Sequence, residues 1–236
     1  RKESSAASDV YKRQVVDEDD SGLIKVAVLG NSKKVAQGDA VIALGNIFGY
    51  ADGMSYGVVS ASNYKATFFD GECAVIATDI PAEEQGTGML FNMDGEVVGM
   101  ISSSVWNDTG KNVVNAYGIS DLKPIIELLI NGKSFPYIGI YGTTVTEQLA
   151  EEHKMPSGIY VADVDPDSPA MAAGIQIGDI ICEASGEEIK DIAAYQNIVI
   201  GSSVGETMEF VGKRLGSDGY VNIKFSVVTT EKEEVK

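Results

Sequence analysis

The chain has 236 residues, of which 44% are hydrophobic, and it carries 35 acidic against 18 basic side chains, for a formal net charge of −17. This hydrophobic content is typical of a folded protein, and the negative charge argues against binding to nucleic acid or to anionic lipid. The apolar runs are too short to span a bilayer, and no signal peptide is visible.

The residues that most often hold metals are scarce. The only histidine is His153, and the two cysteines, Cys73 and Cys182, are far apart in the sequence. Without a cluster of Cys or His, we expect neither a metal nor a cofactor. The pattern also favours two reduced, partly buried thiols over a disulfide.

The first half predicts a β-rich unit. Residues 1–14 are polar and have no apolar period, so we expect a disordered or foreign tail outside the fold. Short apolar runs separated by Gly-Asn, Asp-Gly and Asn-Asp pairs then favour strands joined by tight turns. Without a helical segment among them, they predict an all-β barrel or sandwich. The predicted strands are 24–29, 40–44, 57–61, 72–77, 89–92, 96–102 and 115–118.

The first predicted helix covers residues 121–131 and has one apolar face. Ser120 or Asp121 is expected to cap it, and Pro124 is expected in its first turn, where the missing N–H costs nothing. Residues 133–137 then form a linker.

The remainder alternates strands and short helices, which predicts an α+β module over residues 133–228 followed by a solvated tail at 229–236. Within it, residues 167–181 read DSPAMAAGIQIGDII. Pro169 suits the first position of a small helix, Gly174 suits its end, and Gly178-Asp179 suits a tight turn before a buried strand.

The segment DSPAMAAGIQIGDII resembles the SPA-x-x-AGI-x-x-GDII signature of the PDZ domain in HtrA-type serine proteases. The resemblance implies that Tyr137-Ile138-Gly139-Ile140 is a loop whose N–H groups receive the carboxylate of a peptide, although an ordinary edge strand is an alternative. The candidate peptide-binding residues are Tyr137, Ile138, Gly139, Ile140, Ala194, Tyr195 and Ile198.

The first half resembles the C-terminal barrel of the trypsin-like protease domain in the same family. The matching segments are VLGNSKKVAQGDAVIALGN at 28–46, GVVSA at 57–61, FNMDGEVVGM at 91–100 and NAYGISDLKPIIELLI at 115–130. The resemblance implies a mainly β fold, with a partial trypsin-like antiparallel barrel over residues 15–132 and an α+β PDZ domain after it. An N-terminal barrel bearing the catalytic His and Asp is expected to be missing from this chain.

The catalytic serine of the family is also absent. The family's GNSGGPL segment aligns with Glu84-Gln85-Gly86-Thr87-Gly88-Met89-Leu90, which puts Gly86 at the position of the nucleophile. Thr87 is a weak substitute, and Glu83 and Glu84 oppose the negative charge that an oxyanion develops. His153 fits the end of a helix better than a catalytic base, so no catalytic residue is predicted.

We therefore expect an HtrA-like, catalytically inactive protein that binds extended peptides or protein C-termini through its PDZ domain. The main alternative is a fragment of an active HtrA-type serine endopeptidase involved in protein quality control. A third hypothesis is a scaffold that forms homo-oligomers through the barrel. Proteins of this family imply an extracytoplasmic location and a membrane anchor in the full-length protein.

Overall fold

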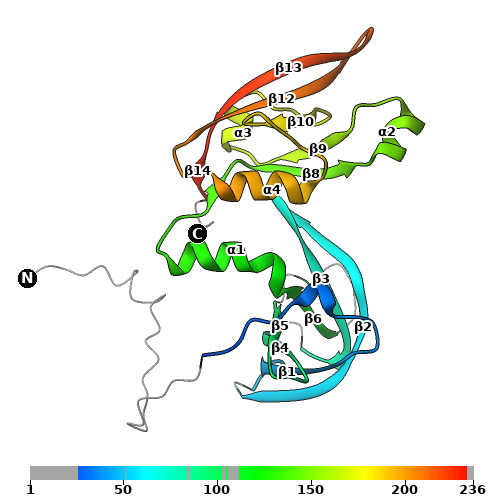
Figure 1. Cartoon of the computed structure of the whole chain (residues 1–236), viewed down its shortest axis with the longest axis vertical. Coiled ribbons are helices and arrows are strands. Elements are labelled where there is room, and N and C mark those ends of the chain that lie inside the picture. Colours follow the sequence, from blue (N-terminus) through cyan, green and yellow to red (C-terminus); the bar gives the residue numbers. More distant parts are fainter. Residues whose placement is uncertain (1–25, 51, 84–85, 103–104, 106–111, 233–236) are drawn as a thin grey trace, which may run out of the picture.

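The computed structural model describes residues 26–50, 52–83, 86–102, 105 and 112–232. They form two modules, a β-barrel and a mixed α+β unit, with helix α1 (Ile119–Ile130) lying between them (Figure 1). The mainly β class, with an antiparallel barrel followed by an α+β module, is confirmed.

The first module is a closed antiparallel barrel in the order β1-β2-β3-β6-β5-β4. Its side chains alternate between a buried core and the outer surface, as the period of a strand requires. A 3-10 turn, η1 (Ser32–Lys34), precedes the first strand. The strands are β1 (Ala40–Asn46), β2 (Gly53–Phe68), β3 (Gly71–Pro81), β4 (Thr87–Asn92), β5 (Val97–Ile101) and β6 (Val113–Gly118).

The second module packs one sheet, in the order β13-β12-β10-β9-β8, around a core that includes helix α4 (Ile192–Gly201). Strand β8 is the edge of this sheet. The strands are β7 (Pro136–Tyr137), β8 (Ile140–Val145), β9 (Gly158–Val164), β10 (Ile180–Ala184), β11 (Glu187–Glu188), β12 (Thr207–Gly216), β13 (Gly219–Val228) and β14 (Thr230–Glu231). Two short helices, α2 (Glu147–His153) and α3 (Pro169–Ala172), complete it.

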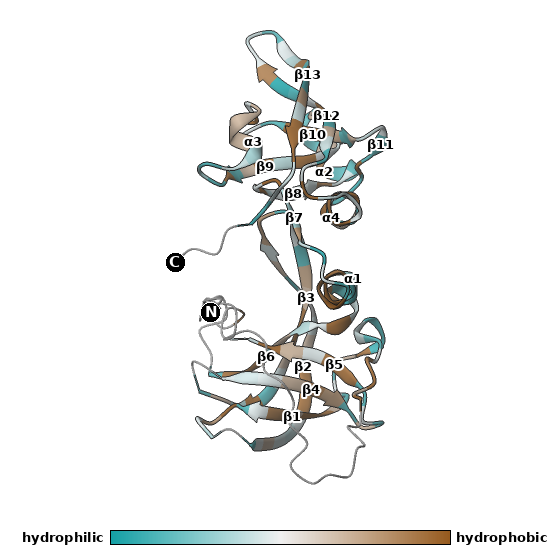
Figure 2. Ribbon diagram, turned by 90° about the vertical axis from the view of Figure 1, so that its left-hand side faces the viewer, coloured by the Kyte–Doolittle hydropathy of each residue, from teal (hydrophilic) through white to brown (hydrophobic). Residues whose placement is uncertain are grey.

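The hairpin β2–β3 is longer than predicted. Its strands have 16 and 11 residues, and they are joined by the two residues Phe69 and Asp70. Figure 2 shows this hairpin rising out of the barrel to the second module. By contrast, the predicted strand at 24–29 forms in its described part only one bridge, between Leu29 and Val97.

The predicted cap of α1 is wrong. The helix begins at Ile119, and its N-cap, Gly118, makes no side-chain hydrogen bond. The Ser120 hydroxyl accepts a hydrogen bond from the N–H of Ser32 at 2.9 Å instead, and the Asp121 carboxylate accepts one from the N–H of Ala74 at 2.9 Å. Both side chains therefore fasten the helix to the barrel, and Pro124 lies inside the helix rather than in its first turn.

Local predictions in the second module are more accurate. The Ser168 hydroxyl caps α3 by accepting a hydrogen bond from the N–H of Met171 at 3.2 Å, and Pro169 is the first residue of that helix. Asp179 does more than form a turn. Its carboxylate is buried and accepts two hydrogen bonds from Arg214, at 2.6 and 2.7 Å.

Residues 229–231, which the sequence predicted as part of a solvated tail, belong to the fold. Thr229 is buried, and its hydroxyl donates to the carbonyl of Ser203 at 2.6 Å. The next two residues form β14, which pairs with β7. No helix within the described part of the chain is long and apolar enough to cross a membrane.

The outer surface of the barrel carries an apolar patch formed by Leu44, Met54, Tyr56 and Met89. Leu44 pairs with Met54 on one neighbouring strand and with Met89 on the other, and Met54 and Tyr56 are 70% and 64% exposed. Because exposed apolar patches promote association, we expect the chain to self-associate through this surface.

Sedimentation equilibrium should then give a mass that rises with concentration above the monomer value of 25.0 kDa. Met54→Lys should lower this association, since it places a charge in the patch. Met93→Lys is the matched control, because Met93 is 59% exposed but lies in the β4–β5 turn. A wild-type chain that stays monomeric at every concentration contradicts the prediction.

Both cysteines are free thiols, and they differ in exposure. Cys73 is buried, and burial, together with the nearby Asp121 carboxylate, raises its pKa to about 12. Burial also raises the pKa of the half-exposed Cys182, against the charge of Lys213. Since the thiolate is the reactive form, iodoacetamide at pH 8 should alkylate Cys182 first and Cys73 at least ~10-fold more slowly.

Mass spectrometry of tryptic peptides measures the two rates. Both thiols should react readily in guanidinium chloride, which removes the burial that protects Cys73. Equal rates in the native protein would show that the barrel opens around Cys73.

Candidate peptide-binding site

The segment between β7 and β8 points three successive N–H groups at one place. Gly139 has a left-handed φ of +93°, and a Cβ there would lie 2.4 Å from the Cβ of Ser168, so only glycine fits. The N–H groups of Ile138 and Gly139 donate to Oδ2 of Asp70, both at 2.7 Å, and that of Ile140 donates to Oδ1 at 3.0 Å. This is a backbone nest that binds an anion.

A fourth donor comes from helix α4. The hydroxyl of Tyr195 donates to Oδ1 of Asp70 at 2.6 Å, and the Tyr195 side chain is almost fully buried. The four donors thus lie on two elements of the second module, while the carboxylate that they bind belongs to the barrel. We call Ile138–Ile140 together with the Tyr195 hydroxyl the carboxylate site.

Asp70 stands at the tip of hairpin β2–β3. It adopts a left-handed φ of +62°, which Asp tolerates better than most residues, and it is only 1% exposed. Its own N–H donates to the carbonyl of Ile140 at 2.7 Å, in the first residue of the edge strand β8. The hairpin tip therefore contacts the carboxylate site through both its side chain and its backbone.

Burial and hydrogen bonding act in opposite directions on Asp70. Burial raises the pKa of its carboxyl group and prevails over the hydrogen bonds from Tyr195, Gly139, Ile140 and Ile138, which lower it. Burial and the neighbouring Asp70 also raise the pKa of Tyr195 well above the usual value, so that its hydroxyl remains a donor.

Neighbouring residues hold the hairpin against the second module. The ring of Phe69 meets that of Tyr141 edge-on, with centroids 5.8 Å apart. The Lys232 ammonium lies 5.5 Å from the centroid of the Phe69 ring. The N–H of Glu72 donates to the side-chain oxygen of Gln196, on α4, at 3.2 Å.

Of the seven predicted binding residues, four meet around one carboxylate: Ile138, Gly139, Ile140 and Tyr195. Tyr137 is different, because its hydroxyl donates to the carboxylate of Asp165. Ala194 and Ile198 are half-buried on α4, and Ile198 packs against the core of the second module. Sequence reasoning missed Asp70, whose Asp-Gly pair indicates a turn but not what the turn touches.

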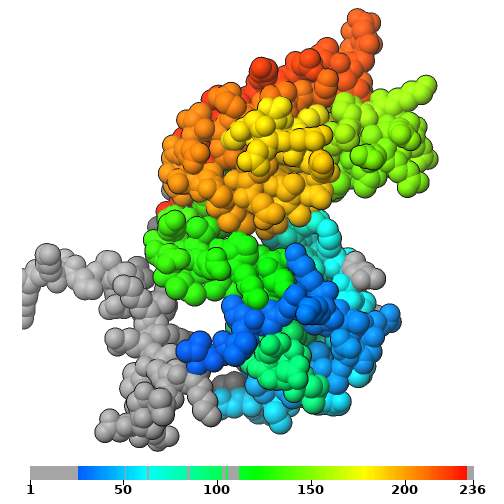
Figure 3. Space-filling view, viewed as in Figure 1, coloured from blue at the N-terminus to red at the C-terminus, as the bar shows by residue number. Residues whose placement is uncertain are grey.

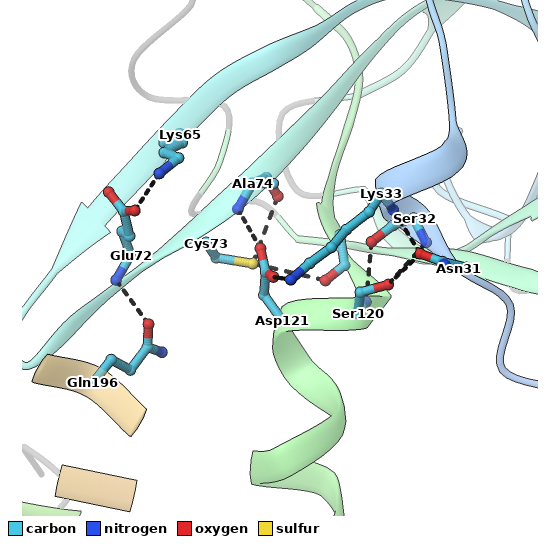
Figure 4. Close-up of polar contacts among 11 residues, drawn as sticks. Asn31, Ser32, Lys33, Lys65, Glu72, Cys73, Ala74, Ser120, Asp121 and Gln196 are labelled. Carbon is cyan, nitrogen blue, oxygen red and sulfur yellow. Dashed lines mark hydrogen bonds and ion pairs between the residues drawn. The ribbon is translucent and has the colours of Figure 1, made fainter. Parts of the chain in front are cut away.

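A polar cleft of about 460 Å³ separates the two modules beside this site. Figure 4 shows its charged lining, in which Lys33 lies 3.7 Å from Asp121 and Lys65 forms an ion pair with Glu72. In Figure 3 the hairpin, in cyan, and α1, in green, lie against the second module. Because its charged groups are already paired, the cleft indicates a boundary between modules rather than a small-molecule site.

The residues considered as catalytic candidates in the sequence do not come together in the part of the chain that the structure describes. Gly86 is buried and its N–H donates to the carbonyl of Glu83 at 2.9 Å, and Thr87 is the exposed first residue of β4. His153 ends helix α2, in the second module, far from β4 (Figure 1). Glu84 lies outside the described residues. Among the residues that the structure describes, no three Cys, His, Asp or Glu side chains cluster as a metal site.

Comparison with known proteins gives one family model and several relatives. Residues 160–214 match a model described as a PDZ domain. The chain is 29% identical over 211 residues to a probable periplasmic serine endoprotease, DegP-like, of Halomonas elongata, covering 86% of this chain and 44% of the relative. It is 28% identical over 235 residues to the serine protease Do-like HtrA of Bacillus subtilis, covering 91% and 51%. The chain thus spans about half the length of these curated relatives.

Solved structures have the same fold. One is described as the HtrA-type protease AlgW with a tripeptide and has a TM-score of 0.59 at 23% identity, covering 90% of this chain and 73% of that one. Another is the serine endoprotease from Yersinia pestis, with a TM-score of 0.54 at 24% identity, covering 90% and 69%. The chain is therefore similar to these proteases in sequence and has the fold of the solved structures.

Proposed function

We propose that this HtrA-type chain, a trypsin-like barrel followed by a PDZ domain, captures the carboxyl termini of peptides at its carboxylate site. The observation that carries the proposal is the carboxylate already held there. Three N–H groups and the Tyr195 hydroxyl bind the Asp70 side chain, and a peptide terminus offers the same two oxygens to the same donors.

The edge strand β8 supports this proposal. A bound peptide would pair its backbone with the edge strand of the sheet, so that main-chain hydrogen bonds supply affinity whatever the peptide's sequence. The carbonyl of Ile140 already accepts a hydrogen bond from the N–H of Asp70, as it would from the last residue of a peptide.

The surroundings of the site favour an apolar last side chain. Ile138 and Ile140 are buried in the core of the PDZ domain, and the half-buried Ile198 packs beside it. Two of the structural neighbours, both described as AlgW, are described as holding a tripeptide and a decapeptide.

Isothermal calorimetry with hexapeptides tests the proposal. Peptides that end in Val, Ile or Leu with a free carboxyl group should bind, and the same peptides with an amidated terminus should not, since the amide cannot accept from all four donors. Gly139→Ala should weaken binding at least about tenfold, because the added Cβ strains a left-handed residue and collides with Ser168.

Gly95→Ala provides the matched control. Gly95 also has a left-handed φ, of +79°, but a Cβ there meets nothing within 4 Å, and the residue lies in the β4–β5 turn of the barrel. Its substitution should leave peptide affinity unchanged. No binding by any free-carboxyl peptide, in wild type or in the Asp70→Asn variant described below, would refute the proposed function.

The barrel, in this proposal, does not cleave peptide bonds. Gly86 brings no nucleophile, and the single histidine belongs to the PDZ domain, which supports an inactive protease homologue. The alternative is a piece of an active serine endopeptidase, in keeping with the relatives' names and with a chain that spans about half their length.

Incubation of the chain with unfolded casein separates the two cases. We expect no cleavage by wild type. Cleavage that disappears in Thr87→Ala but persists in Thr207→Ala would identify Thr87 as a nucleophile and overturn the proposal. Thr207 is the suitable control, because it is likewise the exposed first residue of a strand.

The location follows the relatives. Because the Halomonas elongata and Marinomonas relatives are named periplasmic endoproteases, we propose an extracytoplasmic site of action for this chain. A membrane anchor in the full-length protein is part of the same proposal.

A further inference from the structure

We propose that Asp70 is an internal ligand of the PDZ domain: its carboxylate fills the carboxylate site, so that a peptide binds only after the β2–β3 hairpin withdraws. This inference rests on the proposed function and concerns the regulation of the same site. It would make the chain a peptide-binding protein whose site is closed at rest by its own barrel.

The contact leaves no capacity for a second carboxylate. All three N–H groups of the nest, and the Tyr195 hydroxyl, already donate to Asp70. A peptide terminus brought next to the buried Asp70 would place two negative charges within a few ångströms of each other in a low dielectric, which is strongly unfavourable. Occupation by Asp70 and occupation by a peptide are therefore mutually exclusive.

The backbone of the hairpin blocks the edge strand as well. The N–H of Asp70 uses the carbonyl of Ile140, the first acceptor that β8 offers to an added strand. Asp70 thus makes both kinds of contact that a peptide C-terminus would make. Its carboxylate binds in the nest, and its N–H forms the first main-chain hydrogen bond to β8.

The turn geometry of the β2–β3 hairpin does not require an aspartate at position 70. A two-residue turn with a left-handed residue is served equally by Asn or Gly, neither of which brings a charge. A carboxylate that is 1% exposed requires partners, and those that receive it here, Ile138, Gly139, Ile140 and Tyr195, all belong to the other module. Its charge therefore serves the contact between modules.

The remaining contacts of the tip are of a kind that can separate. They include one aromatic pair, Phe69 with Tyr141, the Lys232 ammonium over Phe69, and one hydrogen bond from Glu72 to Gln196. The polar cleft between the modules lies beside the tip, and a second, open and mainly apolar hollow is lined by Phe68, Phe69, Ile125, Phe135, Tyr137, Tyr141 and Lys232. The Asp70 carboxylate is the one of these contacts that the carboxylate of a peptide can replace with the same donors.

Asp70→Asn tests the exchange directly. Asn keeps the left-handed backbone but presents an NH₂ group to donors, so the internal ligand is lost while the nest remains. The probe is a labelled pool of hexapeptides ending in Val, Ile or Leu with a free carboxyl group, and fluorescence anisotropy measures Kd. If the closed form predominates by tenfold or more, Asp70→Asn should bind at least about tenfold more tightly than wild type.

Two further variants control the result. Asp94→Asn makes the same chemical change in the exposed β4–β5 turn and should bind as wild type does. Phe69→Ala removes the aromatic contact but keeps the carboxylate, so its affinity should lie between those of wild type and Asp70→Asn. Phe69→Ala also provides a test of the inference if the Asp70→Asn variant does not fold.

Each outcome has a separate meaning. If wild type and Asp70→Asn bind equally tightly, and Gly139→Ala abolishes binding, the peptide site exists but Asp70 does not close it. If a cooperatively folded Asp70→Asn, or a folded Phe69→Ala, binds more weakly than wild type, the contact is a permanent clamp and the inference is wrong. If no folded variant binds the pool, the proposed function fails as well.

Hydrogen exchange gives a readout without peptide. The amides of Ile138, Gly139 and Ile140 should be protected in wild type and should exchange faster in Asp70→Asn and Phe69→Ala, while the amides of β12 keep their rates. Unchanged exchange at the nest would show that Asp70 does not cover it and would contradict the inference.

Discussion

The buried carboxylate of Asp70 constrains how the two modules of this protein meet. A carboxylate removed from water loses several kcal/mol of solvation, whereas each hydrogen bond from a neutral donor returns only about 1.5–3 kcal/mol, so one or two donors do not suffice. The carboxylate site supplies four. Displacing the hairpin without offering another acceptor would leave both the nest and the Tyr195 hydroxyl unsatisfied.

Much of the fold could be predicted from local sequence, because local geometry dictates it. Ser168 and Pro169 begin α3 as their capping chemistry predicts, and the nest has a glycine, Gly139, where a Cβ would collide with Ser168. The alternation of short apolar runs predicted an all-β barrel or sandwich, and the barrel is the one that forms. These features depend on residues within a few positions of one another, or on a periodicity that any strand must show.

The contacts that sequence reasoning missed connect distant segments. Ser120 and Asp121 are good cap residues, but they bind Ser32 and Ala74, so the helix begins earlier and without a side-chain cap. The partners of Asp70 lie 68 to 125 residues further along the chain. An Asp-Gly pair predicts a turn wherever the chain goes, and nothing local tells a solvated turn from one inserted into another module.

A ligand that is covalently attached cannot be diluted. The tip of the β2–β3 hairpin reaches the nest through 11- and 16-residue strands rooted in the barrel, so its effective concentration at the site is fixed by geometry and does not depend on the amount of protein. Such a tether sets a threshold. A free peptide displaces Asp70 only when its concentration multiplied by its affinity for the site exceeds the effective concentration of Asp70 multiplied by the affinity of Asp70. The protein would therefore bind few peptides when chain ends are scarce, and many once they accumulate.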